Sequence, residues 1–388
     1  MIPYGKQEIT QQDIDSVVDV LKSDFLTQGP QVPLFESKLI EHTNAKYALA
    51  VNSATSALHI ACLAVGLGKG DWLWTSPITF VASSNCGLYC GAQVDFIDID
   101  PKTYNLCPKK LEEKLIIAEQ NGTLPKVVIP VHLCGQPCDM KAIHKLAQKY
   151  GFYIIEDASH AIGGKYHNKP IGNCEYSDIT IFSFHPVKII TTAEGGAAVT
   201  NSKEFADKMS LLRSHGITRE ASMMEGESHG DWYYQQIDLG FNYRMTELQA
   251  ALGVSQIQKL DHFVEKRHKL ANRYNTLLAD LPITLPYQLE DTYSGLHLYV
   301  IRLNLNKITL THKAVFDALR AKGIGVNLHY IPIYTQPYYK KMGFKLENFP
   351  ESEQYYREAI SLPMFHTMTE QQQDNIVNTL SDIIISKL

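Results

Sequence analysis

Lys188 lies in an apolar, glycine-rich stretch that is unusual for a charged side chain, and it is the first candidate for chemistry. Residues 183–196 read SFHPVKIITTAEGG. Burial disfavours the charged form of an amine and lowers its pKa, so that the neutral amine becomes a usable nucleophile. Schiff-base formation with a carbonyl compound requires such an amine. The alternative is a lysine whose stem packs on apolar neighbours while its ammonium reaches water.

Two acidic residues, Glu156 and Asp157, close a short apolar run and begin the segment EDASHA. A carboxylate at the end of a buried strand is costly unless a cation or hydrogen-bond donor meets it. The segment therefore indicates either a carboxylate with a functional partner or a structural ion pair or helix cap.

A third segment, NSATSA at residues 52–57, reads as the junction between a strand and a helix. Free N–H groups at a helix start, with small hydroxyl side chains beside them, bind phosphate well. An ordinary helix cap is the alternative. Together the three segments offer a phosphate site, an acid and a lysine, which is the set that pyridoxal phosphate (PLP) needs.

Short apolar runs alternate with helical patterns from residue 46 onward, which predicts an α/β fold with a mostly parallel sheet. Such sheets bind ligands at the carboxyl ends of their strands. The expected strands are 46–51, 94–99, 127–131, 152–155, 179–184 and 197–200, and the expected helices include 57–65 and 139–150.

The C-terminal third is expected to form a smaller α+β domain. A long helical stretch from about Met245 past Leu270 links it to the large domain, and residues 298–303 and 326–330 read as strands. We therefore expect an N-terminal arm, with a helix at about 12–21, and a large cofactor-binding domain over 1–250. The linking helix and the small domain would occupy 251–388.

Composition agrees with an enzyme-sized globular protein. The 388 residues are 45% hydrophobic and 20% charged, with a formal net charge of −5, which offers no bulk attraction to nucleic acid or an anionic membrane. No signal peptide or apolar run of about 20 residues is recognisable, so a cytoplasmic location is expected. The seven scattered cysteines are expected to be free thiols, without a metal site.

Several long motifs in order make the chain resemble the DegT/DnrJ/EryC1/StrS family of PLP-dependent sugar aminotransferases. They are NSATSAL (52–58), EDASHA (156–161), SFHPVK (183–188), TTAEGGA (191–197), RSHG (213–216) and GFNYR (240–244). The resemblance implies the PLP-dependent transferase fold type I, similar to aspartate aminotransferase. In dehydratase relatives a histidine replaces the lysine, so Lys188 favours transamination.

The resemblance also assigns cofactor contacts. Lys188 would form the Schiff base and move the proton, Asp157 would keep the pyridine nitrogen protonated, and Phe80 would stack on the ring. His160 stands where the family places a residue near the ring hydroxyl. The phosphate contacts match Ala54, Thr55 and Ser183, together with Asn242 from a neighbouring subunit, which implies a homodimer with shared active sites.

Within the family, the chain resembles most the members that aminate C4 of a UDP-linked 4-keto-6-deoxy-N-acetylhexosamine on the route to pseudaminic acid, with L-glutamate as donor. The product would be UDP-4-amino-4,6-dideoxy-N-acetyl-altrosamine. The positions that match substrate contacts are Tyr4, Leu26, Thr27, His185, His329, Tyr330, Ile331 and Pro332.

Two other functions remain as alternatives. One is an aminotransferase of the same family acting on another nucleotide keto-sugar, of the 4-amino-arabinose or perosamine type. The other is a non-catalytic binding protein on the same fold, although the candidate site residues are all intact. A nicotinamide oxidoreductase is disfavoured, because no G-x-G-x-x-G motif follows the first expected strand.

Overall fold

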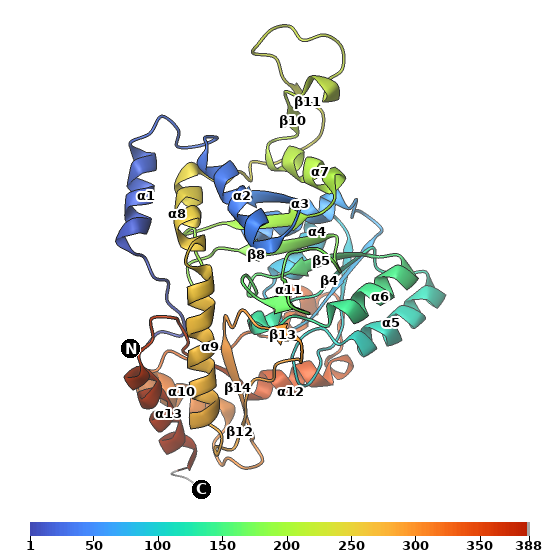
Figure 1. Cartoon of the computed structure of the whole chain (residues 1–388). Coiled ribbons are helices and arrows are strands. Elements are labelled where there is room, and N and C mark those ends of the chain that lie inside the picture. The colour runs from blue at the N-terminus through green and yellow to red at the C-terminus, as the bar shows by residue number, and fades with distance from the viewer. Residues whose placement is uncertain (386–388) are drawn as a thin grey trace.

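A seven-stranded sheet forms the centre of the large α/β part of the chain (Figure 1). The computed structural model describes residues 1–385. Strands β8, β5, β4, β2 and β3 run parallel, whereas β9 is antiparallel to both of its neighbours, β1 and β8. In spatial order the strands are β1 (Tyr47–Val51), β9 (Gly196–Thr200), β8 (Ile179–Ser183), β5 (Tyr153–Asp157), β4 (Val127–Ile129), β2 (Trp72–Thr75) and β3 (Gln93–Phe96).

Helices cover both faces of this sheet, because successive strand side chains point to opposite faces. Ile154 packs into the core of one face and Ile155 into the core of the other. One face is covered by α2 (Gln31–Thr43), α5 (Pro108–Asn121), α6 (Met140–Tyr150) and α8 (Glu247–Ile257). The opposite face is covered by α3 (Ala54–Ala64), α4 (Ala82–Tyr89) and α7 (Lys203–Arg213). The predicted α/β fold with a mostly parallel sheet is therefore confirmed.

The C-terminal part has its own antiparallel sheet and its own apolar core, made of residues between Leu270 and Ile384. The sheet order is β12 (Ile283–Thr284), β14 (Tyr299–Leu303) and β15 (Ala359–Leu362). The helices are α9 (Leu260–Leu277), α10 (His312–Ala321), α11 (Pro337–Lys340), α12 (Pro350–Glu358) and α13 (Glu370–Ile385).

An arm between α7 and α8 extends away from the body of the chain and carries the hairpin of β10 (Ile217–Thr218) and β11 (Gln235–Gln236) (Figure 1). At the N-terminus, α1 (Gln11–Leu21) packs against α8. The remaining short strands, β6 (Lys165–Tyr166), β7 (Lys169–Pro170) and β13 (Thr292–Tyr293), form a third small sheet.

Two element predictions are wrong. The helical stretch after Met245 is not one helix, because the backbone leaves helical geometry at Lys259, whose ammonium is held by Asp13 at 2.6 Å. Residues 326–330 do not form a strand, and only Asn327 makes an isolated bridge to Ser361. The Asn327 side chain accepts a hydrogen bond from the amide of Leu328 at 2.8 Å, a local contact that competes with strand pairing.

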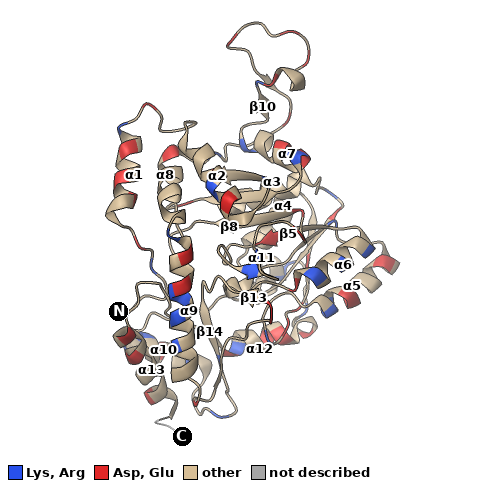
Figure 2. Cartoon of the chain, viewed as in Figure 1, with Lys and Arg blue, Asp and Glu red and all other residues tan. Residues whose placement is uncertain are grey.

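Charged residues of both signs are interspersed over the helices, as Figure 2 shows for α5 and α9. No helix in the described part of the chain is long and apolar enough to cross a membrane. All seven cysteines are free thiols, as expected.

Candidate active site

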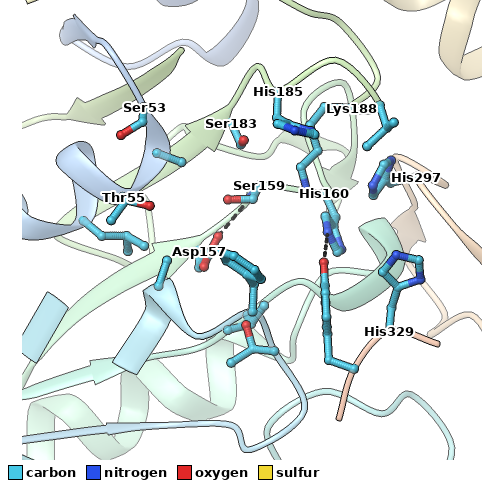
Figure 3. Close-up of a pocket in the computed structure, with 18 of the residues that line it drawn as sticks. Ser53, Thr55, Asp157, Ser159, His160, Ser183, His185, Lys188, His297 and His329 are labelled. Atoms are coloured by element: carbon cyan, nitrogen blue, oxygen red, sulfur yellow. Dashed lines mark hydrogen bonds between the residues drawn. The ribbon is translucent and has the colours of Figure 1, made fainter. Parts of the chain in front are cut away.

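A cavity of about 600 Å³ opens at the carboxyl edge of the large sheet, and most of the predicted site residues line it (Figure 3). Those it brings together are Tyr4, Ala54, Thr55, Phe80, Asp157, His160, Ser183, His185, Lys188, His329 and Tyr330. Outside its lining in this single chain are Leu26, Thr27, Asn242, Ile331 and Pro332. Because Asn242 was predicted to act from a neighbouring subunit, one chain does not test that role.

Sheet register explains why segments far apart in sequence meet here. Gly196 pairs with Val51 on one side and with Ser183 on the other. Asp157 is the last residue of β5, the neighbour of β8. The carboxyl ends of β1, β8 and β5 and the start of antiparallel β9 therefore lie along one edge.

The N-terminus of α3 points its first turn at the cavity. Ser53 caps the helix by accepting a hydrogen bond from the Ser56 amide at 3.1 Å. The amides of Ala54 and Thr55 have no partner in the described chain, and both residues line the cavity beside Ser183. Free amides at the positive end of an 11-residue helix, with a hydroxyl nearby, form a site for a phosphate group.

Gly196 is required for this close approach, because a Cβ atom there would overlap the backbone nitrogen of Ala54. We expect Gly196→Ala to displace the start of α3, to destabilise the fold by about 1–3 kcal/mol and to weaken cofactor binding. Thermal unfolding and titration with PLP measure both effects. Gly68→Ala is the matched control, because its Cβ would meet nothing within 4 Å. Unchanged PLP affinity in Gly196→Ala would contradict this reading of the phosphate site.

The loop between β8 and β9 carries Lys188 into the cavity. Phe184 anchors both ends of this loop, since its amide donates to the Gly195 carbonyl at 2.9 Å and its own carbonyl accepts from the Thr192 amide at 3.0 Å. Burial lowers the pKa of the Lys188 amine to about 8, although the Asp157 carboxylate opposes the shift. At pH 7 about a tenth of Lys188 is therefore the neutral, nucleophilic amine, far more than for an ordinary lysine with a pKa of about 10.4.

The pKa of Lys188 predicts how the rate at which the cofactor-free protein reacts with the aldehyde of PLP depends on pH. Above a pH of about 8 the Lys188 amine is mostly neutral, and below it the amine is mostly protonated. We expect the rate of covalent PLP capture, followed by absorbance in a rapid-mixing experiment, to rise with pH and to level off above about 8. A rate that continues to rise towards the pKa of an ordinary lysine, about 10.4, would contradict the shifted amine.

The neighbours Glu156 and Asp157 have different environments, because they point to opposite faces of β5. Asp157 faces the cavity and accepts hydrogen bonds from the Ser83 hydroxyl at 2.7 Å and the Ser159 amide at 3.1 Å. Glu156 bonds instead to His132 at 2.7 Å and to Ser177 and Thr180. Burial alone would raise the pKa of Glu156, but these hydrogen bonds outweigh it and lower the pKa.

A directed pair of hydrogen bonds holds His160. Its Nδ1 accepts from the Cys134 amide at 3.2 Å, so the ring proton must reside on Nε2, which lies 3.1 Å from the Tyr330 hydroxyl. Burial, strengthened by Lys188 and His329, lowers the pKa of His160 well below its usual value. His160 is therefore a neutral imidazole with a defined tautomer.

Two polar residues that sequence reasoning did not assign to the site are Ser83, which contacts Asp157 from α4, and His297, which lines the cavity from the segment that precedes β14. Ser83 lies in no recognisable motif. The one sequence feature that could have pointed to His297 is its position directly before the predicted strand 298–303.

The residues present fit PLP, a planar aldehyde with a phosphate and a pyridine nitrogen. The amides of α3 offer an anion site, Asp157 a carboxylate, and Lys188 a low-pKa amine, within one cavity. Phe80 lines the same cavity with 58% of its surface exposed, which leaves an aromatic face for a ring to cover. Fold and site together define a PLP-dependent transferase of fold type I.

The chain belongs to the DegT/DnrJ/EryC1/StrS aminotransferase family, whose sequence profile matches residues 7–381. It is a PLP-dependent sugar aminotransferase.

Relatives of the chain match over nearly their full length. The spore coat polysaccharide biosynthesis protein SpsC of Bacillus subtilis is 37% identical over 386 residues, with 99% of this chain and 97% of that protein covered. A UDP-4-amino-4,6-dideoxy-N-acetyl-beta-L-altrosamine transaminase of Campylobacter jejuni is 38% identical over 387 residues, with 99% and 98% covered. The structure of Helicobacter pylori PseC, an aminotransferase involved in the biosynthesis of pseudoaminic acid, aligns with a TM-score of 0.90, 32% identity and 99% of each chain covered.

Proposed function

We propose that the chain transfers an amino group from L-glutamate to C4 of a UDP-linked 4-keto-6-deoxy-N-acetylhexosamine. The observation that carries this proposal is the 38% identity, over the whole length, to a transaminase named for the 4-amino altrosamine product. The fold similarity to PseC supports the same substrate class. The expected product is UDP-4-amino-4,6-dideoxy-N-acetyl-altrosamine, a precursor for pseudaminic acid.

We assign the cofactor contacts as follows. The amides of Ala54 and Thr55, with the Ser183 hydroxyl, hold the phosphate, and Phe80 covers one face of the ring. The Asp157 carboxylate holds a proton on the pyridine nitrogen, while Ser83 and the Ser159 amide keep that carboxylate in position. His160 would contact the ring hydroxyl. When bound, PLP supplies an electron sink that stabilises negative charge at the substrate carbon.

Lys188 moves the proton in both halves of the reaction. Its amine takes the proton from Cα of glutamate and later delivers a proton to C4 of the sugar. A group that must act as base and as acid works best with a pKa close to the operating pH, and a pKa of about 8 meets that requirement. Because the cavity contains one such lysine, glutamate and the keto-sugar use it in turn.

We propose a homodimer in which Asn242 of one subunit reaches the phosphate bound by the other. In the single chain Asn242 is exposed and lies outside the cavity. The neighbouring arm exposes large apolar side chains, with Trp232 at 74% and Leu239 at 76%, which a second subunit would cover. We also propose Leu26, Thr27, Ile331 and Pro332 as substrate contacts, although they lie outside the cavity lining of the single chain.

A substrate panel tests the proposal. The purified holoenzyme is incubated with L-glutamate and with 4-keto-sugars linked to UDP, dTDP or GDP, and 2-oxoglutarate formation is measured. We expect the UDP-linked 4-keto-6-deoxy-N-acetylhexosamine to give the highest kcat/KM. A preference for another nucleotide or for a keto-pentose would favour the second candidate.

That second candidate is an aminotransferase for another nucleotide keto-sugar, of the 4-amino-arabinose or perosamine type. The observation that favours it is the 37% identity to SpsC, a protein named for polysaccharide biosynthesis without a stated sugar. The same panel separates the two.

A further inference from the structure

Three buried histidines, His160, His297 and His329, line the cavity around Lys188, and Figure 3 shows them together. Two of them have protein partners on both ring nitrogens. His160 is bonded to the Cys134 amide and to the Tyr330 hydroxyl. His329 lies 2.8 Å from the Ser361 hydroxyl through Nδ1 and 3.4 Å from the Asn327 amide group through Nε2.

His297 differs from the other two, because neither of its ring nitrogens has a hydrogen-bond partner in the described chain. The residue is only 4% exposed and its Nδ1 is fully buried. Its ring packs against His160 with the ring centroids 4.4 Å apart, and its carbonyl accepts a hydrogen bond from Arg267 at 3.1 Å. The imidazole is thus held in place by its backbone and by packing, while its polar atoms are left unpaired.

The charge state of His297 is also defined. Burial lowers its pKa well below the usual value, and the nearby His160, Lys188 and Arg267 act in the same direction. A neutral imidazole carries one N–H, and an unpaired buried N–H is rarer than an unpaired acceptor. The proton therefore belongs on Nε2, the nitrogen that is left to face a ligand.

We propose that His297 is a ligand-contacting residue, whose Nε2–H donates a hydrogen bond to an oxygen atom next to the reacting carbon of the bound substrate. This inference rests on the proposed function. Both substrates carry such an oxygen: the α-carboxylate of glutamate adjoins Cα, and the C3 hydroxyl of the keto-sugar adjoins C4. The ring lines the cavity, and Nε2, which is not among the fully buried atoms, has no partner in the described chain and is therefore available to a ligand.

His297→Leu and His297→Gln test the proposal as a pair, because glutamine retains an N–H donor near the position of Nε2 and leucine does not. The two half-reactions of the holoenzyme are measured separately by rapid-mixing absorbance, first with L-glutamate and then with the UDP-linked 4-keto-sugar. We expect His297→Leu to lower kcat/KM by about 10- to 100-fold in at least one of them, and His297→Gln to recover most of the loss. The melting temperature should not fall, because leucine removes an unpaired buried polar group.

The two half-reactions identify which substrate oxygen His297 contacts. A lower kcat/KM with glutamate alone indicates the carboxylate, and a lower kcat/KM with the keto-sugar alone indicates the C3 hydroxyl. A lower kcat/KM in both half-reactions indicates that His297 contacts both substrates. An independent readout is the ¹⁵N resonance of the His297 imidazole in the holoenzyme, which should report an Nε2–H tautomer and move when that substrate is added. Unchanged rates in both half-reactions would overturn the proposal. So would a loss that glutamine does not recover and that accompanies a lower melting temperature. A wild-type enzyme that aminates no keto-sugar would instead contradict the proposed function, while the glutamate half-reaction would still test His297.

Discussion

Replacement of Lys188 by alanine is expected to abolish turnover, with a loss of at least about 10⁴-fold in kcat, because we assign both the covalent attachment and the proton transfer to this one side chain. The cavity would keep its anion site and Asp157, so the variant should still bind PLP. It should lack the visible absorption band of the lysine-bound cofactor. Absorbance spectra and 2-oxoglutarate formation from glutamate measure the two effects.

Lys188→Arg is the matched control for charge. Arginine keeps a cation at this position but is always protonated, so it is neither a nucleophile nor a base. We expect it to be as inactive as alanine. Turnover retained in either variant would show that another group carries the proton, and the assignment of Lys188 would fail.

Asp157→Asn is expected to reduce kcat of the glutamate half-reaction by about 10²- to 10³-fold. Asparagine has the size of aspartate. Its Oδ1 can still accept a hydrogen bond from the Ser159 amide, and its NH2 group can donate to the Ser83 hydroxyl oxygen, so the packing is preserved while the negative charge is lost. Loss of one partner of a buried charge pair costs about 3–5 kcal/mol, and the lower half of that range, about 3–4 kcal/mol, corresponds to this loss of rate. Rapid-mixing absorbance with saturating glutamate measures the effect.

Glu156→Gln provides the internal comparison, because Glu156 is the adjacent residue on the same strand and points away from the cavity. Its loss of charge should lower stability by about 1–3 kcal/mol through the hydrogen bonds with His132 and Thr180. The glutamate half-reaction should change little. If the two variants lost activity equally, the division of roles between the neighbouring carboxylates would be wrong.

The residues that sequence reasoning predicted for the site share a local signal. Asp157 ends one short apolar strand and Lys188 follows another, and the carboxyl ends of such strands meet at one edge of a sheet. Ala54 and Thr55 were predicted beside a helix start, although the helix was expected from residue 57 and begins at Ala54. Site residues that lie in a motif next to the end of a strand or helix could therefore be predicted from the sequence.

Residues whose role depends on contacts between distant segments could not be predicted in this way. Ser83 reaches Asp157 across 74 positions of the chain, and His297 faces the cavity because Arg267 and His160 hold it. The strand β2 (Trp72–Thr75) was missed because it is short and follows a turn rich in glycine. Lys259, at the break between α8 and α9, pairs with Asp13, which lies in the N-terminal arm.

Transfer of isotopic nitrogen tests the central claim most directly. The holoenzyme is incubated with ¹⁵N-labelled L-glutamate and the UDP-linked 4-keto-6-deoxy-N-acetylhexosamine, and the sugar nucleotide is examined by NMR and mass spectrometry. Amination at C4 predicts a product with ¹⁵N bonded to C4 and an equal amount of 2-oxoglutarate, and none of either with Lys188→Ala. A sugar that returns without label from the wild-type enzyme, or that carries it at another carbon, would contradict the assignment.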